Sequence, residues 1–359
     1  MAEESRTDAL VERLFESTVG ALELMAVYLG AELGLYRALD ESGAMTAGEL
    51  AEAASIDERY AREWLEQQAV AGFLAVNDGA ADAGQRRFRL DEEHAGPLAR
   101  AGDSAHVAPF GHLLTGVAQA LPKVVQAYRD GSGVPYSEYG RDFRCGQGGI
   151  NRPVFTEELP TAWMDAMPDV RDRVAAGGRV ADVGCGLGWS TIALAKRFES
   201  ARIDGVDLDP ASVADAARNA EAAGVNGDRV RFIEGDAASL SEHGTYDLAL
   251  VLESLHDMAR PVEALSGMRE ALADDGVLLV VDERVADEFT APGDPVERIM
   301  YGWSVVHCLP VGREEQPSAA TGTVMRASTL RRYAESAGFG TVEVLPVEND
   351  FFRLYRLDR

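Results

Sequence analysis

The chain has 359 residues, 46% hydrophobic and 26% charged, which is enough for roughly two domains with a sizeable core. Its 60 acidic and 34 basic side chains give a net charge of −26. So acidic a surface repels phosphate backbones and anionic lipid headgroups, which argues against nucleic acid or a membrane as a partner. We also expect no membrane span, because no apolar run approaches the ~18 residues that a span needs.

The start of the chain, MAEESRTDALVERLF, is acidic and amphipathic, unlike a secretory signal. The three cysteines are far apart and form no CxxC pair: Cys145, Cys185 and Cys308. This spacing argues against a disulfide framework and a thiolate zinc site, and it suits a reducing compartment. Composition therefore predicts a soluble cytoplasmic protein.

The first 95 residues have the pattern of a winged helix. Residues 8–39 have mostly helical apolar spacing, and residues 20–39 are apolar around much of the circumference, as in a core helix or a dimer seam. Thr46 and Glu49 form a capping box, and Asp57 caps a second helix that Gly72 ends. Two short strands, 73–76 and 87–90, surround a hairpin tip. We therefore predict a winged-helix domain over residues 1–95.

Residues 96–172 are predicted to be a helical lid or substrate segment. Helices are expected at 109–129 and 155–167, with a long irregular loop at 130–152 between them. Such a loop in a compact domain usually covers or binds something. The candidate lid residues are Tyr136, Tyr139, Asn151, Arg152 and Trp163, although aromatic residues at such spacing are often core.

From residue 173 to 359 strands alternate with helices. The expected strands are 179–183, 202–206, 230–234, 248–252 and 276–281, and the helices between them are 191–198, 210–223 and 261–273. This alternation predicts an α/β fold with a doubly wound, Rossmann-like parallel sheet. A helix at 330–337 and strands at 341–345 and 351–357, close enough to pair antiparallel, complete it.

A glycine-rich loop follows the first strand, with Asp182, Gly184, Gly186 and Gly188 at alternate positions. Glycines let a ligand approach the backbone, and the next helix supplies free N–H groups. A dinucleotide fingerprint needs a third glycine at position 189, which is Trp189, and this weakens the case for a nicotinamide-dependent oxidoreductase. A tight turn without a ligand is the plainer alternative.

Carboxylates also end the next two strands. Asp207 is suited to accept hydrogen bonds from ribose hydroxyls, and Asp236 is suited to an adenine amine, although a loop acid in a turn is an equally ordinary role for Asp236. Because parallel strands end at one edge of the sheet, Asp182, Asp207 and Asp236 are expected to lie around one crevice.

These motifs resemble those of the class I S-adenosylmethionine-dependent methyltransferases, over residues 178–359. Segments 21–25, 33–36 and 59–65 look like the winged-helix domain of a bacterial small-molecule methyltransferase family, similar to the plant-type O-methyltransferases. The resemblance implies a seven-stranded sheet, S-adenosylmethionine as cofactor with S-adenosylhomocysteine as product, and homodimerisation through the winged helix. It also implies these cofactor-binding residues: Asp182, Gly184, Gly186, Gly188, Asp207, Leu208, Asp236, Ala237 and Glu253.

His256, beyond the fourth strand, is the candidate general base. Imidazole titrates near neutrality, and Leu-His-Asp-Met at 255–258 is similar to the stretch that carries the base in plant-type O-methyltransferases. Asp282, at the end of the fifth strand, matches a family carboxylate that orients the base. The second family carboxylate is missing from residues 320–326. One alternative stays open: His256 only structures the loop, and the enzyme methylates nitrogen or carbon, which needs no histidine base.

His307 and Cys308 are expected to line the acceptor side, and we count His307 among the candidate catalytic residues. Adjacent residues rarely face one another and the sequence shows no third ligand, so we expect no metal site. The alternative of another class is a ligand-sensing winged-helix regulator. Its recognition helix would be residues 57–71, whose net charge of −2 is unlike that of DNA readers. We therefore predict a methyltransferase for a small-molecule acceptor, most simply an oxygen.

Overall fold

The computed structural model describes residues 5–79, 81–225 and 227–359, which divide into two compact units. Unit 1 holds the described residues up to Gly116 together with residues 141–153, and unit 2 holds residues 117–140 and 154–359. Residues 1–4 of the predicted winged helix and Ala80 of its hairpin tip lie outside the described residues. The three-part division at residues 95 and 172 stays a prediction.

Unit 1 contains the helical domain with its small wing. Its elements are α1 (Arg6–Glu32), α2 (Leu35–Ser42), α3 (Ala47–Ala54), α4 (Glu58–Val70), β1 (Ala75–Asn77), β2 (Arg87–Arg89) and α5 (Glu92–Leu98). The predicted capping box is confirmed, because the Thr46 N–H donates to Glu49 Oε2 at 2.7 Å and the Glu49 N–H donates to Thr46 Oγ1 at 3.3 Å. Asp57 caps α4 as expected, and β1 pairs antiparallel with β2.

The predicted irregular loop at 130–152 is wrong over most of its length. Helix α6 (Pro109–Asp130) is followed by a 3-10 turn, η1 (Tyr136–Tyr139), and then by α7 (Gly140–Glu157). Glycine has a low helix propensity, which made this segment look irregular. Here the glycines allow close packing, since a Cβ on Gly116 would lie 2.6 Å from the Phe143 nitrogen and one on Gly146 would lie 2.6 Å from the Leu113 nitrogen.

Unit 2 is built on a seven-stranded sheet. The strands are β3 (Arg179–Val183), β4 (Arg202–Asp207), β5 (Val230–Glu234), β6 (Tyr246–Leu252), β7 (Leu272–Glu283), β8 (Thr341–Val344) and β9 (Phe352–Asp358). They lie in the order β5-β4-β3-β6-β7-β9-β8. The first five strands are parallel, and β9 pairs antiparallel with β7 and β8. The predicted doubly wound sheet with an antiparallel C-terminal hairpin is confirmed.

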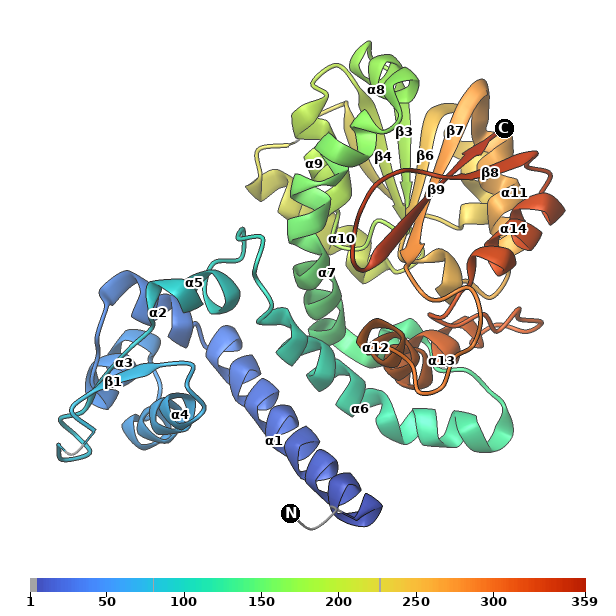
Figure 1. Ribbon diagram of the computed structural model, residues 1–359. Helices are drawn as coiled ribbons and strands as arrows, with labels where there is room; N and C mark the ends of the chain where they lie inside the picture. The colour runs from blue at the N-terminus through green and yellow to red at the C-terminus, as the bar shows by residue number, and fades with distance from the viewer. Residues whose placement is uncertain (1–4, 80, 226) are drawn as a thin grey trace. The chain divides into compact units, whose positions relative to one another are not determined.

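Helices cover both faces of this sheet (Figure 1). One face carries α8 (Pro168–Ala175), α9 (Trp189–Arg197) and α10 (Pro210–Ala222); the other carries α11 (Pro261–Ala271) and α14 (Ala327–Ser336). Side chains alternate along β3, so that Val180 packs in the first core and Ala181 and Val183 in the second. Because both faces of the sheet are buried, the sequences of these strands are nearly continuous runs of apolar residues.

Short helical turns follow the carboxyl ends of the parallel strands. They are η3 (Ala237–His243) after β5, η4 (Leu255–Asp257) after β6, and the succession α12 (Pro295–Trp303), η5 (Ser304–Cys308) and α13 (Leu309–Gly312) after β7. A π-helical turn, η2 (Leu159–Trp163), precedes α8 and packs its Trp163 side chain into the first core. The strand-end turns position the candidate site.

Helix α1 is apolar yet mostly exposed. An 18-residue window in it reaches a mean hydropathy of 1.3, with 11% of that window buried. By length and composition α1 is long enough to cross a membrane, contrary to the expectation from the sequence. Only the C-terminal part of α1 is buried within the described residues, at Val27 and Gly30. A Cβ on Gly30 would lie 2.5 Å from the Trp64 ring.

Candidate functional site

The glycine-rich loop joins β3 to α9 in left-handed backbone conformations, with φ of +72°, +52° and +78° at Gly184, Gly186 and Gly188. A Cβ on Gly184 would lie 2.4 Å from Ser254 Oγ, and one on Gly188 would lie 2.9 Å from the Ala216 Cβ. At Gly186 no atom of the described residues lies within 4 Å of that position. Packing therefore requires two of the glycines, while the backbone at the third is open to a ligand.

Asp182 lies beneath this loop, only 1% exposed. Its Oδ2 accepts hydrogen bonds at 2.5 Å from the hydroxyls of Ser190 and Thr191, both in the first turn of α9. Burial raises the pKa of Asp182, and the two hydroxyl hydrogen bonds oppose this rise. The geometry ties the end of β3 to the start of α9, so Asp182 supports the loop from below.

Asp207, the last residue of β4, reaches across to the loop. The Gly186 N–H donates to its Oδ2 at 2.8 Å, and the Asp209 N–H donates to its Oδ1 at 2.9 Å. Each carboxylate oxygen has a second lone pair with which to accept a ligand hydroxyl. The next residue, Leu208, is 66% exposed, an unusual position for a large apolar side chain and one suited to cover a flat ring.

The remaining predicted cofactor residues lie at the ends of β5 and β6. Asp236 is exposed and caps η3, since its Oδ1 accepts from the Ala238 N–H at 2.9 Å, and Ala237 is buried. Glu253 has a φ of +50°, a left-handed conformation that residues other than glycine rarely adopt. Its N–H donates to the Val281 carbonyl at 2.8 Å. Such backbone strain clusters at functional sites.

His256 and Asp282 form a buried pair. Nδ1 of His256 lies 3.0 Å from Asp282 Oδ1 and 3.1 Å from Oδ2, and the two residues are 2% and 1% exposed. The carboxylate accepts the hydrogen from Nδ1, which leaves Nε2 of the neutral ring as an acceptor. The structure thus brings together the two residues that the sequence placed 26 positions apart.

Two further acids that the sequence analysis missed surround His256. Glu283 Oε2 lies 3.4 Å from Nδ1, and Asp257 Oδ1 lies 3.4 Å from Nε2. Burial lowers the pKa of His256, but Asp282, Glu283 and Asp257 outweigh burial and raise it well above its ordinary value. Burial also raises the pKa of Glu283 far above its usual range. Each acid directly follows a predicted site residue in the sequence, and this adjacency is the signal from which both acids could have been predicted.

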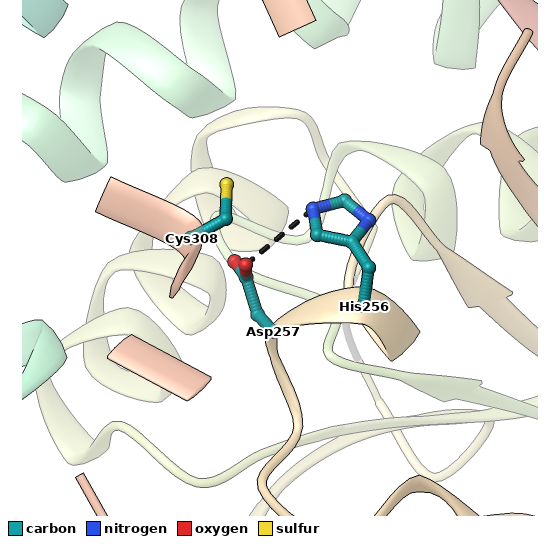
Figure 2. A group of neighbouring side chains, drawn as sticks. All are labelled: His256, Asp257 and Cys308. Carbon is teal, nitrogen blue, oxygen red and sulfur yellow. Dashed lines mark ion pairs between the residues drawn. The ribbon is translucent and has the colours of Figure 1, made fainter. Parts of the chain in front are cut away.

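Cys308 also reaches this group (Figure 2). Donor atoms of His256, Asp257 and Cys308 lie within 4.8 Å of one another, although Cys308 comes from η5 and the other two from η4. Burial raises the pKa of the Cys308 thiol to about 12. No pattern in the sequence pairs residue 308 with residue 256, because only the fold brings the two turns together.

His307 lies beside the same group, with its Nδ1 4.0 Å from Asp257 Oδ2 and 3.4 Å from the Cys308 sulfur. Burial lowers the pKa of His307 to about 4, so the ring is neutral near pH 7. The rings of Tyr136 and Tyr139 pack edge-on against it, at centroid distances of 5.8 and 4.6 Å. Of the other candidate lid residues, Trp163 is a core residue of unit 2, and Asn151 and Arg152 belong to unit 1.

Comparison with known families bears on both units. Residues 180–276 match the family described as a methyltransferase domain, and residues 20–100 match the Rv2258c-like winged HTH domain. The first match spans β3 to the middle of β7, and therefore includes the glycine-rich loop, Asp207, Asp236 and His256.

Solved structures share the fold over the whole chain. The mitomycin 7-O-methyltransferase MmcR has a TM-score of 0.69 at 20% identity, with 98% of each chain covered. Human N-acetylserotonin methyltransferase in complex with SAM has a TM-score of 0.72 at 15% identity, covering 100% of this chain and 99% of that one.

Curated relatives match only in part. Malonyl-[acyl-carrier protein] O-methyltransferase of Halalkalibacterium halodurans is 30% identical over 31% of this chain and 40% of its own length. Erythromycin 3''-O-methyltransferase of Saccharopolyspora erythraea is 36% identical over 30% of this chain and 36% of its own length. The chain thus spans less than half the length of each of these two relatives.

Proposed function

We propose that the chain, which matches a methyltransferase domain and a winged HTH domain, is a class I methyltransferase that transfers the methyl group of S-adenosylmethionine to an oxygen of a small molecule. The observation that carries the proposal is the position of the His256–Asp282 pair: His256 follows β6 and Asp282 lies at the end of β7, at the same end of the sheet as the glycine-rich loop. The open backbone at Gly186 then faces the cofactor, Asp207 accepts from the ribose hydroxyls, and Leu208 covers the adenine.

His256 is proposed as the general base. Methyl transfer to a hydroxyl forms the oxygen–carbon bond, breaks the sulfur–carbon bond and releases the hydroxyl proton, which Nε2 of His256 accepts. Asp282 holds the ring through Nδ1 and stabilises the imidazolium that results. Three acids favour the charged ring in the ligand-free protein, whereas the positive charge of a bound sulfonium opposes it.

The acceptor is proposed to approach from the side of His307. Its neutral ring, Tyr136 and Tyr139 present aromatic edges there, and the Tyr139 hydroxyl is occupied by the Val306 carbonyl at 2.8 Å. An aromatic lining suits a mostly apolar small molecule with a polar group near Nε2. N- or C-methylation without a histidine base is the alternative, and in that case loss of His256 leaves turnover unchanged.

Isothermal titration tests the cofactor. We expect binding of S-adenosylhomocysteine with a micromolar dissociation constant and no binding of NAD(H). Binding of NAD(H) with none of S-adenosylhomocysteine would contradict the proposal and favour an oxidoreductase. A ligand-sensing regulator would give a third result: it would bind a ligand, but it would methylate no acceptor when S-adenosylmethionine is supplied.

A homodimer through α1 is proposed as well. Exposed apolar side chains recur along α1 at the three- and four-residue spacing of a coiled-coil seam, with Thr18 in the middle: Val11, Leu14, Leu22, Met25 and Leu29. A seam of this kind is satisfied by an identical helix from a second copy.

A further inference from the structure

His256, Asp257 and Cys308 bring a nitrogen, an oxygen and a sulfur atom close together. Nε2 of His256 and Oδ1 of Asp257 lie 3.4 Å apart, and in the neutral ring, whose Nδ1 hydrogen is bonded to Asp282, both atoms present lone pairs. Asp257 Oδ1 is buried and has no hydrogen-bond partner among the described residues. When the His256 ring is neutral, this buried acceptor lacks a donor, and a cation that accepts electron pairs would satisfy it.

The three donor atoms have the chemistry of a zinc site. They offer an imidazole nitrogen, a carboxylate oxygen and a thiolate sulfur, a set that zinc accepts in tetrahedral geometry. Two nitrogen or oxygen ligands at about 2.0 Å from a tetrahedral ion are about 3.3 Å apart, close to the 3.4 Å between Nε2 and Oδ1. Figure 2 shows the Asp257 carboxylate and the Cys308 side chain beside the same edge of the His256 ring.

A second observation points the same way. Histidines that bind metals usually donate their other ring N–H to a carboxylate, which fixes the ring and the tautomer. His256 makes this contact, because its Nδ1 lies 3.0 Å from the buried Asp282 while Nε2 faces the other two donors. The His256 ring is therefore held in place by a residue that a metal on Nε2 would not displace.

We propose that His256 Nε2, Asp257 and Cys308 form a binding site for a divalent cation of the zinc class. His307 is a further nitrogen donor beside the group, with its Nδ1 3.4 Å from the Cys308 sulfur and 4.0 Å from Asp257 Oδ2, and it is the candidate for the fourth position. Hard cations such as Mg²⁺ prefer all-oxygen sites and are excluded by the sulfur and nitrogen donors.

The site overlaps the proposed base, and this consequence rests on the proposed function. A cation on Nε2 takes the lone pair that would accept the hydroxyl proton. Zinc is therefore expected to inhibit methyl transfer, and a chelator to restore it. The binding itself does not depend on the methyltransferase proposal.

Cobalt(II) titration of chelator-treated full-length protein tests the site directly. A thiolate ligand gives a near-ultraviolet sulfur-to-cobalt band, and tetrahedral geometry gives intense visible bands. We expect both bands to saturate at one cobalt per chain and zinc to displace them. Cys308→Ser should abolish the sulfur-to-cobalt band, whereas Cys145→Ser, which alters a cysteine in α7, should keep it.

Asp257→Asn supplies a second variant that keeps the side-chain size, and we expect it to weaken cobalt affinity at least tenfold while circular dichroism stays native. Absence of a sulfur-to-cobalt band in the wild type, or its persistence in Cys308→Ser, would overturn the metal site. Cobalt binding by a protein that proves unable to bind S-adenosylhomocysteine would leave the metal site standing and overturn the proposed function instead.

Discussion

The backbone N–H of Gly186 donates to Asp207 Oδ2 at 2.8 Å, so the carboxylate expected to hold the cofactor ribose also fixes the glycine-rich loop. One side chain thus shapes both walls of the proposed cofactor site. Its second oxygen is anchored by the Asp209 N–H, which prevents the carboxylate from turning away. Preorganisation of this kind lowers the entropy that a ligand loses on binding.

Asp207→Asn removes the charge and replaces one acceptor oxygen with a donor. A hydrogen bond to a charged group contributes about 1.5–3 kcal/mol, so affinity for S-adenosylhomocysteine should fall roughly 10- to 100-fold by calorimetry. Asp209→Asn is the matched control, because asparagine also caps a helix well and α10 should stay intact. Equal affinities in the two variants would contradict the role of Asp207.

His256→Ala should lower turnover by about 10²–10⁴ and leave cofactor affinity nearly intact, since the lost group acts on the acceptor proton. Single-turnover kinetics with a fixed acceptor measures this. His94→Ala is the control, because His94 lies in unit 1, where its Nδ1 is 3.0 Å from the Phe73 carbonyl. A wild-type rate in His256→Ala would remove the base assignment and favour chemistry without a histidine.

Two glycine-to-alanine substitutions separate helix propensity from packing. Gly116→Ala places a methyl group 2.6 Å from the Phe143 backbone and should destabilise the protein by about 1–3 kcal/mol. Gly20→Ala, in α1 with no neighbouring atom of the described residues within 4 Å, should be neutral or stabilise by about 0.5–1 kcal/mol. Urea unfolding measures both, and similar effects of the two would contradict the close approach of α6 and α7.

Asp169 provides a pH test. Arg356 donates to both of its oxygens at 2.8 Å, and these hydrogen bonds lower the pKa of Asp169 to about 2. A lowered carboxyl pKa contributes stability above about pH 4 that is lost as the pH falls through about 2. Asp169 is 45% exposed, so screening by solvent limits this contribution to about 1 kcal/mol.

Asp169→Asn should therefore cost about 1 kcal/mol of unfolding free energy at pH 7 and nothing near pH 2, where the wild type has lost the same interaction. Asp172→Asn, which changes a more exposed acid on the same helix, should have a smaller effect at pH 7. A pH-independent difference between wild type and Asp169→Asn would show that the ion pair is not its cause.

Light scattering tests the seam on α1. A homodimer of 38.6 kDa chains has a mass of about 77 kDa, twice the chain mass. Leu14→Glu together with Leu22→Glu buries charge in the seam and should yield the monomer. Val70→Glu changes a still more exposed apolar residue on α4 and should leave the dimer intact. A monomeric wild type would rule out the seam. Binding of the wild type to lipid vesicles would instead indicate that the apolar side of α1 contacts a membrane.

The predictions from sequence succeeded where a short-range pattern determines the structure. Buried parallel strands read as apolar runs, and the residues that end them, such as Asp207 and Asp236, fall at the same edge of the sheet for geometric reasons. The capping box at Thr46 and the cap at Asp57 depend only on residues two or three positions away. Each of these signals is local.

The failures have a physical cause in common. Helix α7 escaped prediction because its glycines serve contacts with α6 that propensity alone does not reveal. Cys308 was not linked to His256 because two turns after different strands bring them together. Glu253 was named from family resemblance, but its left-handed backbone cannot be inferred from a glutamate in the sequence. Long-range packing decided all three.

The pairing of β7 has a consequence for how the protein is made. Asp282 and Glu283 lie opposite Arg353 and Phe352 of β9, so the strand that bears these two acids beside His256 is flanked on one side by residues that are synthesised about 70 positions later. Until β9 emerges from the ribosome, that side of β7 is an open edge that invites pairing with another chain. The nascent protein therefore needs protection from aggregation at β7, the strand that carries Asp282 and Glu283, until β9 has been translated. This need lasts long after the cofactor loop has been translated.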